Sequence, residues 1–263
     1  MGTYVYGIVR SAHSSLPQDM DGIGDPPRPA RVLPQGELAA IVSDAPGELR
    51  PKRRDLLAHQ RVLDAAGADG VVLPMRFGSV SPDDDTVLAV LAERAEHFLE
   101  RLGALDGKVE YNVKANHREE AVLRLVMADN DEIRALAEAN REAGGGSQEE
   151  KVRLGEMVAA AVQAREATDA ELLRQALEPT AEAVSAGPQS TGWLANVSFL
   201  VERDSAEGFL AAVDELGRQH EQLDLRVNGP LPPYSFVDTS SSGGEGGTAE
   251  AFGGATAQST TNG

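Results

Sequence analysis

Five histidines are the side chains of this sequence best suited to metal binding or to acid–base catalysis. They are His13, His59, His97, His117 and His220. The helical zinc-peptidase motif needs two histidines four residues apart with a glutamate between them, and no pair here has that spacing. His59 and His97 fall in expected helices, where surface or capping roles are the ordinary ones. We therefore expect no catalytic residue, no metal site and no cofactor.

Two other patterns match ligand-binding motifs only superficially. Asp129-Asn130-Asp131-Glu132 begins like a calcium loop, but the glycine at position six and the closing bidentate glutamate are absent. This run fits the N-terminal cap of a helix better. Gly144-Gly145-Gly146 lies between two helical segments rather than after a strand, so we interpret it as a hinge and not as a phosphate-binding loop.

The composition narrows the class of protein. The formal net charge of −18 disfavours a nucleic-acid surface and an anionic membrane surface, because both need clustered Lys and Arg. The longest apolar runs are far shorter than the roughly 18 residues that span a bilayer. No cysteine is present, so disulfides and thiol catalysis are excluded. The sequence predicts a cytoplasmic protein that binds neither nucleic acid nor membrane.

Hydrophobic patterning predicts an α+β fold in two domains. The first domain, residues 1–106, is expected to contain a central strand at 3–9 and a long proline-rich surface loop at 16–36. Two more strands are expected at 37–43 and 71–80, and two helices at 53–67 and about 87–102. The central strand is assigned because both of its faces are apolar. The loop is assigned because five prolines interrupt it.

The second domain, residues 107–238, begins with a strand of clean alternation at 108–114. Helical patterning follows from about 118 to 185, and the segment ends with a strand, a helix and a strand at 195–201, 205–221 and 223–228. By patterning alone this half is one strand short of a ferredoxin-like unit. Residues 239–263 are rich in Ser, Gly and Thr, and we expect a disordered tail there.

Arg76 is the most informative single charge. It stands between Met75 and Phe77 in the expected strand 71–80, which is otherwise apolar. Because an isolated guanidinium cannot stay buried without a partner, Arg76 must reach a carboxylate, solvent or another molecule. Pairing within the domain and a role at a partner surface both remain open. Arg76 and Phe77 are therefore candidate binding residues or markers of the fold.

A second candidate lies near the C-terminus, in the run Gly229-Pro230-Leu231-Pro232-Pro233-Tyr234-Ser235-Phe236-Val237. Pro232 and Pro233 cannot donate to a strand ladder, so we expect Tyr234–Val237 to start a new strand or to follow a sheet edge. Two interpretations are open: the prolines and Phe236 stiffen the start of a strand, or they form an edge that docks a partner.

Four segments in this order resemble the gas vesicle protein F/L family: Tyr4-Val5-Tyr6-Gly7, Leu73-Pro74-Met75-Arg76-Phe77-Gly78, the strand 108–114 and the proline-rich run ending at Val237. The resemblance covers about residues 3–237 and does not separate the F branch from the L branch. It implies two α+β domains, the C-terminal one ferredoxin-like with additional helices.

The resemblance also implies a function. Members of the family are non-enzymatic accessory proteins of gas vesicle assembly, thought to bind the very hydrophobic major shell protein. The implied partners are that protein and other gas vesicle accessory proteins, and the implied location is the cytoplasm, in association with the vesicle. Two alternatives stay open: a small-ligand-binding regulatory module on ferredoxin-like domains, and an enzyme whose site assembles from carboxylates with His59 or His97.

Overall fold

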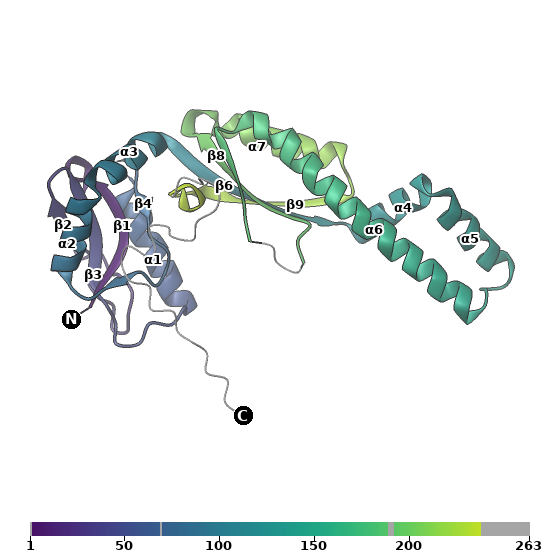
Figure 1. Ribbon diagram of the computed structural model, residues 1–263, viewed down its shortest axis with the longest axis horizontal. Coiled ribbons are helices and arrows are strands. Elements are labelled where there is room, and N and C mark those ends of the chain that lie inside the picture. Colours follow the sequence, from purple (N-terminus) through teal and green to yellow (C-terminus); the bar gives the residue numbers. More distant parts are fainter. Residues whose placement is uncertain (1, 69, 189–191, 238–263) are drawn as a thin grey trace, which may run out of the picture. The chain divides into compact units, whose positions relative to one another are not determined.

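The chain forms two compact units. The first contains Met1–Glu110 and Pro230–Gly263, and the second contains Tyr111–Gly229. The computed structural model describes residues 2–68, 70–188 and 192–237 (Figure 1). The chain passes between the units within two strands, so each unit is described by itself. The predicted boundaries at residues 106 and 238 concern independent folding, which compactness does not test, and they stay a prediction.

The first unit is built on an antiparallel sheet of order β2-β3-β1-β4, in which β5 also pairs with β1. Its strands are β1 Thr3–Arg10, β2 Arg31–Gln35, β3 Leu38–Asp44, β4 Leu73–Pro74 and β5 Val80–Ser81. The predicted central position of β1 is confirmed. This strand is buried from Thr3 to Val9 because it has neighbours on both edges and side chains packed on both faces.

The helices of the first unit are α1 Arg53–Ala66, α2 Asp84–Glu93 and α3 Ala95–Leu105, with short 3₁₀ turns η1 Ser11–His13 and η4 Tyr234–Phe236. The second predicted helix is in fact two helices, separated at Arg94. Asp83 caps α2, since its side chain accepts a hydrogen bond from the Thr86 backbone amide at 2.8 Å. Leu56 of α1 lies outside the core, because its side chain is 42% exposed.

Two strand predictions in this unit need correction. The proline-rich segment 16–36 was predicted to be loop throughout, yet its last five residues form β2. Pro34 is tolerated there because β2 lies at the edge of the sheet. The predicted strand 71–80 is only two short strands, β4 and β5. A turn with Gly78 at φ +102° separates them, a backbone conformation that glycine adopts readily.

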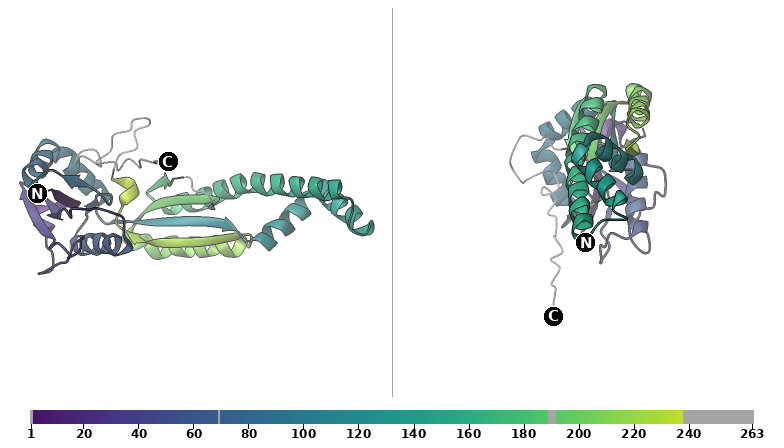
Figure 2. Two further views of the ribbon diagram at one scale, coloured as in Figure 1. Left: turned by 90° about the horizontal axis from the view of Figure 1, so that it is seen from below. Right: turned by 90° about the vertical axis from the view of Figure 1, so that its right-hand side faces the viewer.

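The second unit has a four-stranded sheet of order β7-β8-β6-β9, in which β7 and β8 run antiparallel, together with helices (Figure 2). Its elements are β6 Lys108–His117, α4 Glu119–Asp129, α5 Asp131–Glu142, α6 Gln148–Leu177, η2 Glu178–Thr180, β7 Ala183–Ala186, β8 Ala195–Glu202, η3 Arg203–Ser205, α7 Ala206–Gln219 and β9 Leu223–Leu231. The aromatic core stacks Phe209 of α7 against Tyr111 of β6 and Phe199 of β8, at ring-centroid distances of 5.2 and 5.4 Å.

The sequence missed β7. Helical patterning was extended to residue 185, whereas α6 ends at Leu177 and β7 pairs with β8 in register, Val184 opposite Phe199. This strand supplies the one that patterning lacked. It escaped detection because its four residues, Ala-Val-Ser-Ala, are too few to show alternation.

The helices α4, α5 and the first half of α6 extend beyond the end of the sheet (Figure 2). Their core is small: Val122, Val126 and Ile133 are buried, and half-buried side chains of α6 pack against them. The Asn130 side chain caps α5 by accepting from the Ile133 amide at 3.2 Å, which confirms the predicted cap. Gly144–Gly146 connects α5 with α6, as predicted, with positive φ at all three residues.

Residues Tyr234–Val237 were predicted to start a new strand or to follow a sheet edge, and the new strand is wrong. Tyr234–Phe236 form the 3₁₀ turn η4, with Pro233 before it and Val237 after it. β9 instead continues to Leu231, inside the proline-rich run. The tail predicted at 239–263 lies outside the described residues.

Gly7 of β1 tests the close packing of the first sheet. A Cβ added there would lie 2.9 Å from the Leu73 carbonyl oxygen and 2.8 Å from a methyl group of Val72. We expect Gly7→Ala to lower the free energy of unfolding by about 1–3 kcal/mol, measured by urea denaturation. Gly47→Ala is the control, because a Cβ there meets nothing within 4 Å. Equal unfolding midpoints for the two variants would contradict the packing argument.

Candidate functional site

The loop Pro74–Ser79 presents Arg76 and Phe77, and backbone bonds to β1 hold it at both ends. The Met75 amide donates to the Tyr6 carbonyl at 2.8 Å, and the Val5 amide donates to the Ser79 carbonyl at 2.9 Å. Across the turn, the Ser79 amide and hydroxyl both donate to the Arg76 carbonyl, at 3.2 and 2.9 Å. Arg76 and Phe77 therefore stand at the tip of a closed loop.

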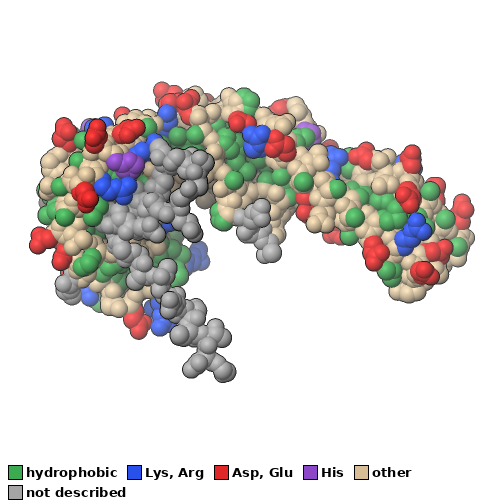
Figure 3. Space-filling model, in the orientation of Figure 1, with side chains coloured by type: hydrophobic (Ala, Val, Ile, Leu, Met, Phe, Trp, Pro, Cys, Tyr) green, Lys and Arg blue, Asp and Glu red, His purple; other side chains and the backbone are tan. Residues whose placement is uncertain are grey.

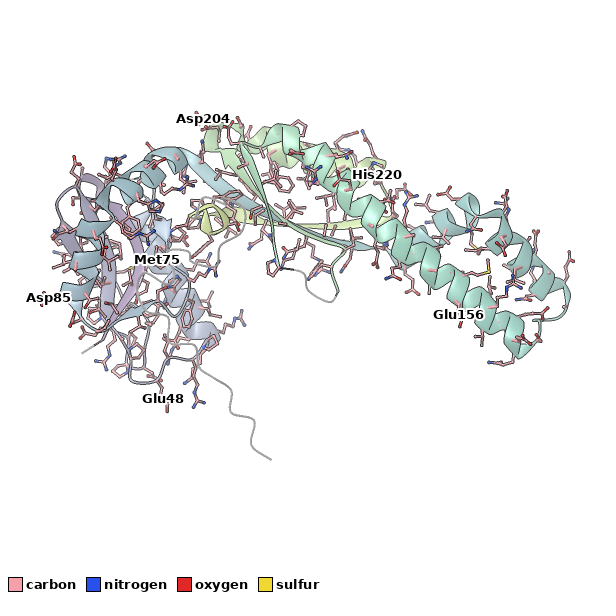
Figure 4. The ribbon with its side chains drawn as sticks, in the orientation of Figure 1. Glu48, Met75, Asp85, Glu156, Asp204 and His220 are labelled. Atoms are coloured by element: carbon pink, nitrogen blue, oxygen red, sulfur yellow. The ribbon has the colours of Figure 1, made fainter. Side chains whose placement is uncertain are left out.

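A buried side-chain network fixes this loop against α1. The Nε2 of His59 lies 3.1 Å from the carbonyl oxygen of Met75 (labelled in Figure 4), and its Nδ1 lies 2.9 Å from the Tyr4 hydroxyl. Since a carbonyl only accepts, Nε2 carries the proton and Nδ1 accepts from Tyr4. The Tyr4 oxygen in turn accepts from the Gly78 amide at 3.3 Å. One chain of hydrogen bonds thus links β1, α1 and the loop.

A parallel arrangement holds the segment before β2. The Tyr6 hydroxyl accepts from the Ile23 amide at 2.9 Å and lies 3.0 Å from the Ser43 hydroxyl. The Tyr6 ring also stacks on the His59 ring at 5.4 Å. Gly22 leaves room for the hydroxyl, because a Cβ at that position would lie 2.1 Å from it. Tyr4 therefore holds the Pro74–Ser79 loop, and Tyr6 holds the segment before β2.

Burial keeps the whole network neutral. It lowers the pKa of His59 to about 4, only partly offset by the hydrogen bond to Met75, and it raises the pKa of both Tyr4 and Tyr6 above the ordinary value. The imidazole and the Tyr4 hydroxyl are both buried, and both ring nitrogens of His59 are engaged by hydrogen bonds within the fold. The network is therefore suited to fixing the shape of the loop.

Arg76 is exposed, and its side chain forms no hydrogen bond or ion pair with any of the residues that the structure describes. On a turn rather than in a strand, the guanidinium is exposed to solvent, and pairing with a carboxylate of the domain stays a prediction. Phe77 is half-buried, with its ring centroid 5.9 Å from that of His59 and 6.0 Å from that of Tyr4. A role of both residues in partner binding stays a prediction.

The second candidate segment docks onto the first unit. Arg101 of α3 donates to the carbonyls of Phe236 at 2.6 Å and Val237 at 3.2 Å. The buried carboxylate of Glu110 accepts from the Ser235 amide at 2.8 Å and from its hydroxyl at 2.7 Å. Phe236 is buried, so it stabilises this arrangement and is not available to a partner.

The structure brings two of the predicted residues to one place. Phe77 and Tyr234, 157 positions apart by their numbers, both pack against the buried cluster that contains Tyr4 and Tyr6. Pro232 and Pro233 lie between β9 and η4, where Pro232 is half-buried and Pro233 is buried. The sequence missed His59 as the organising residue, although its position on the buried face of α1 follows from the spacing to Val62 and Leu63.

A second buried polar network lies in the other unit. The fully buried carboxylate of Asp169 on α6 lies 2.9 Å from His117 Nε2, 3.1 Å from Arg165 Nε and 3.3 Å from the Gln222 amide nitrogen. These donors compensate the buried charge. The network ties the middle of α6 to the end of β6 and the start of β9. Patterning could not reveal it, because the residues are far apart in sequence.

The concave surfaces are open clefts. One of them has a volume of about 930 Å³ and is lined by residues of α6, β7 and β8, with Trp193 at its wall. The Trp193 ring has Lys114 Nζ at 5.6 Å and Arg226 Cζ at 5.2 Å from its centroid. Within ranges 2–68, 70–188 and 192–237, no group of three or more His, Asp or Glu could hold a metal ion, and no helix is long and apolar enough to cross a membrane.

Comparison with known proteins gives consistent matches over nearly the whole chain. The model of the family described as gas vesicle synthesis protein GvpL/GvpF matches residues 2–238. The chain is 68% identical to gas vesicle protein F of Streptomyces sp. (strain CB03234), over 90% of this chain and all of that protein. It is 28% identical to gas vesicle protein L of the same strain, over 89% of this chain and 92% of that protein.

A solved structure shares the fold. The crystal structure of gas vesicle protein GvpF from Anabaena sp. PCC7120 superposes with a TM-score of 0.69 at 24% sequence identity, covering 91% of this chain and 99% of that chain. The sequence alone did not separate the F type from the L type. The two Streptomyces comparisons place the greater similarity with protein F.

The His59 network predicts a pH dependence of stability. Because the folded pKa is about 4 and the unfolded value about 6.5, the unfolded chain binds the proton first as pH falls. His59 therefore contributes a loss of stability between about pH 6.5 and 4, reaching roughly 3 kcal/mol. The test measures the unfolding free energy of the native chain and of His59→Gln from pH 7 to 4. The native chain should lose more stability over this range than the variant, by the contribution of His59. Parallel profiles would show that His59 does not titrate on unfolding.

Arg76 and Arg101 make a matched pair, since each substitution by Ala removes one positive charge. We expect Arg76→Ala to change the free energy of unfolding by less than about 0.5 kcal/mol, because the side chain is exposed and unpaired among the described residues. Arg101→Ala should cost about 1–3 kcal/mol, because two carbonyls lose their donor. Thermal and urea unfolding measure both; the reverse order would contradict the assignment.

Proposed function

Because this chain belongs to the gas vesicle synthesis protein GvpL/GvpF family and so has a role in gas vesicle formation, we propose that it binds the hydrophobic major shell protein and helps to nucleate the vesicle. The observation that carries this proposal is the tip of the Pro74–Ser79 loop. There a guanidinium that has no partner among the described residues stands beside a half-buried aromatic ring, on a loop held by backbone and side-chain hydrogen bonds.

The physical properties of the chain support such a role. A hydrophobic shell subunit must be kept from uncontrolled association before it is assembled. Acidic side chains are scattered over the visible face (Figure 3), and a net charge of −18 makes complexes of this protein repel one another. Arg with an adjacent aromatic side chain is a frequent combination at the centres of protein–protein interfaces. A preformed loop also binds at a lower entropic cost.

The proposal extends to partners, place and activity. We propose other gas vesicle accessory proteins as further partners, a cytoplasmic location in association with the vesicle, and a non-enzymatic mode of action. The network around His59 supports the last point, since its imidazole and the Tyr4 hydroxyl are buried and bonded within the fold.

We also infer that the second unit is ferredoxin-like with additional helices. Support comes from its element order, a strand, helices, two strands, a helix and a strand, together with the sheet order β7-β8-β6-β9. In this assignment α4 and α5 are the additional helices, and α6 and α7 are the two that the basic fold requires. Under this assignment the protein has two α+β domains with different folds.

Co-expression with the shell protein tests the proposed function. We expect the shell protein to stay in the soluble fraction and to co-purify with the full chain, and Arg76→Ala to weaken this retention about tenfold, as expected for a central interface arginine. Arg141→Ala is the control, since Arg141 is an exposed arginine of the second unit with a 76% exposed side chain.

Two outcomes would refute the proposal. One is a shell protein that behaves identically with and without this chain. The other is normal vesicle formation after deletion of the gene in a cell without a second copy. Full retention by Arg76→Ala with intact binding would reject only the loop tip as the contact.

A further inference from the structure

Helix α1 exposes two neighbouring leucines at its solvent side. Leu56 is 42% exposed and Leu57 is 50% exposed. A single exposed leucine is ordinary, but two adjacent ones on the first turn of a helix leave apolar area uncovered. The buried face of α1 is occupied by other residues, among them Ala58, His59 and Val62. The leucines are therefore not needed to hold α1 on the sheet.

Two arginines flank Leu57 along the helix. Arg53, Leu57 and Arg61 follow one another at intervals of four residues, and all three are exposed. Residues four apart lie on the same side of a helix, about 6 Å apart along its axis. Arginine, leucine and arginine thus form one line pointing away from the core, with Leu56 beside it. These four residues, Arg53, Leu56, Leu57 and Arg61, are called the α1 patch.

The positive charges of the α1 patch are uncompensated. Neither Arg53 nor Arg61 forms an ion pair within the described part of the chain, whereas Arg54 pairs with Asp25 at 2.7 Å and with Asp55 at 3.3 Å. The start of α1 adds partial positive charge, since Lys52 at the cap position provides no side-chain acceptor. Asp64, an exposed carboxylate three residues after Arg61, bounds the patch at the far end.

We propose that the α1 patch docks an acidic amphipathic helix of a partner protein, in which an Asp or Glu stands four residues before and four residues after a Leu. Such a helix places its carboxylates at the spacing of Arg53 and Arg61 and its leucine against Leu56 and Leu57. Because the chain as a whole carries −18, this patch attracts an acidic partner where most of the surface repels it. The inference does not depend on the proposed function.

A designed peptide tests it with the full chain. The probe is a fluorescently labelled helix of about 18 residues with this Glu–Leu–Glu spacing, long enough to be helical in water. We expect binding that weakens with added salt, that falls about tenfold in Arg53→Glu/Arg61→Glu, and that falls similarly in Leu56→Ser/Leu57→Ser. Thermal unfolding of each variant checks that it is folded.

Matched controls separate the patch from bulk charge. Arg141→Glu/Arg218→Glu changes the net charge equally at exposed arginines of the second unit, and Leu210→Ser removes a leucine that is 37% exposed. Both variants should bind the peptide normally. Equal weakening by the controls, equal binding of a peptide with the same composition in scrambled order, or no binding would overturn the proposal. So would self-association of the chain that Arg53→Glu/Arg61→Glu abolishes, since the patch would then accept a second copy.

Discussion

The hydrogen-bond chain from Tyr4 through His59 to the Met75 carbonyl is the constraint on which the first unit depends. It joins the central strand, α1 and the β4–β5 loop through groups that are buried. Loss of any one member leaves the others without a partner in an apolar surrounding, at a cost of about 1–3 kcal/mol each. The inward surfaces of α1 and of the loop are therefore committed to the fold, and what remains for recognition is on their outer sides.

This division explains why the two sequence segments with the strongest patterns have different roles. In the loop Pro74–Ser79 the hydrogen bonds at both ends hold Arg76 and Phe77 at the tip, where Arg76 is exposed and Phe77 is half-buried. In the run after β9 it serves attachment, since Arg101 and Glu110 bind the backbone of η4 and Phe236 is buried. Proline, glycine and aromatic residues at fixed offsets thus fix the backbone geometry of both segments. Only the loop Pro74–Ser79 also presents an exposed charged side chain, that of Arg76.

The second unit follows the same rule around Asp169. Its carboxylate is fully buried, and histidine, arginine and glutamine side chains compensate it, so the middle of α6 cannot shift without exposing the charge. The first half of α6 has no such constraint and packs with α4 and α5 over a small apolar core. Both units therefore combine a polar network with an apolar sheet face, and rings such as Tyr6 and Phe209 stand at those networks and cores.

The sequence by itself determined the elements whose signal is local. The alternation and apolar faces of β1, β3, β6 and β8 and the periodicity of α1 and α7 specified strands and helices, because one buried face leaves a periodic trace. It also determined the family, through four segments in order. Only the tertiary structure decided the rest. β2 and β7 form because neighbouring strands pair with them, and η4 turns because Glu110 and Arg101 bind it. Arg76 became exposed and His59 central through contacts between residues far apart in sequence, which no local pattern records.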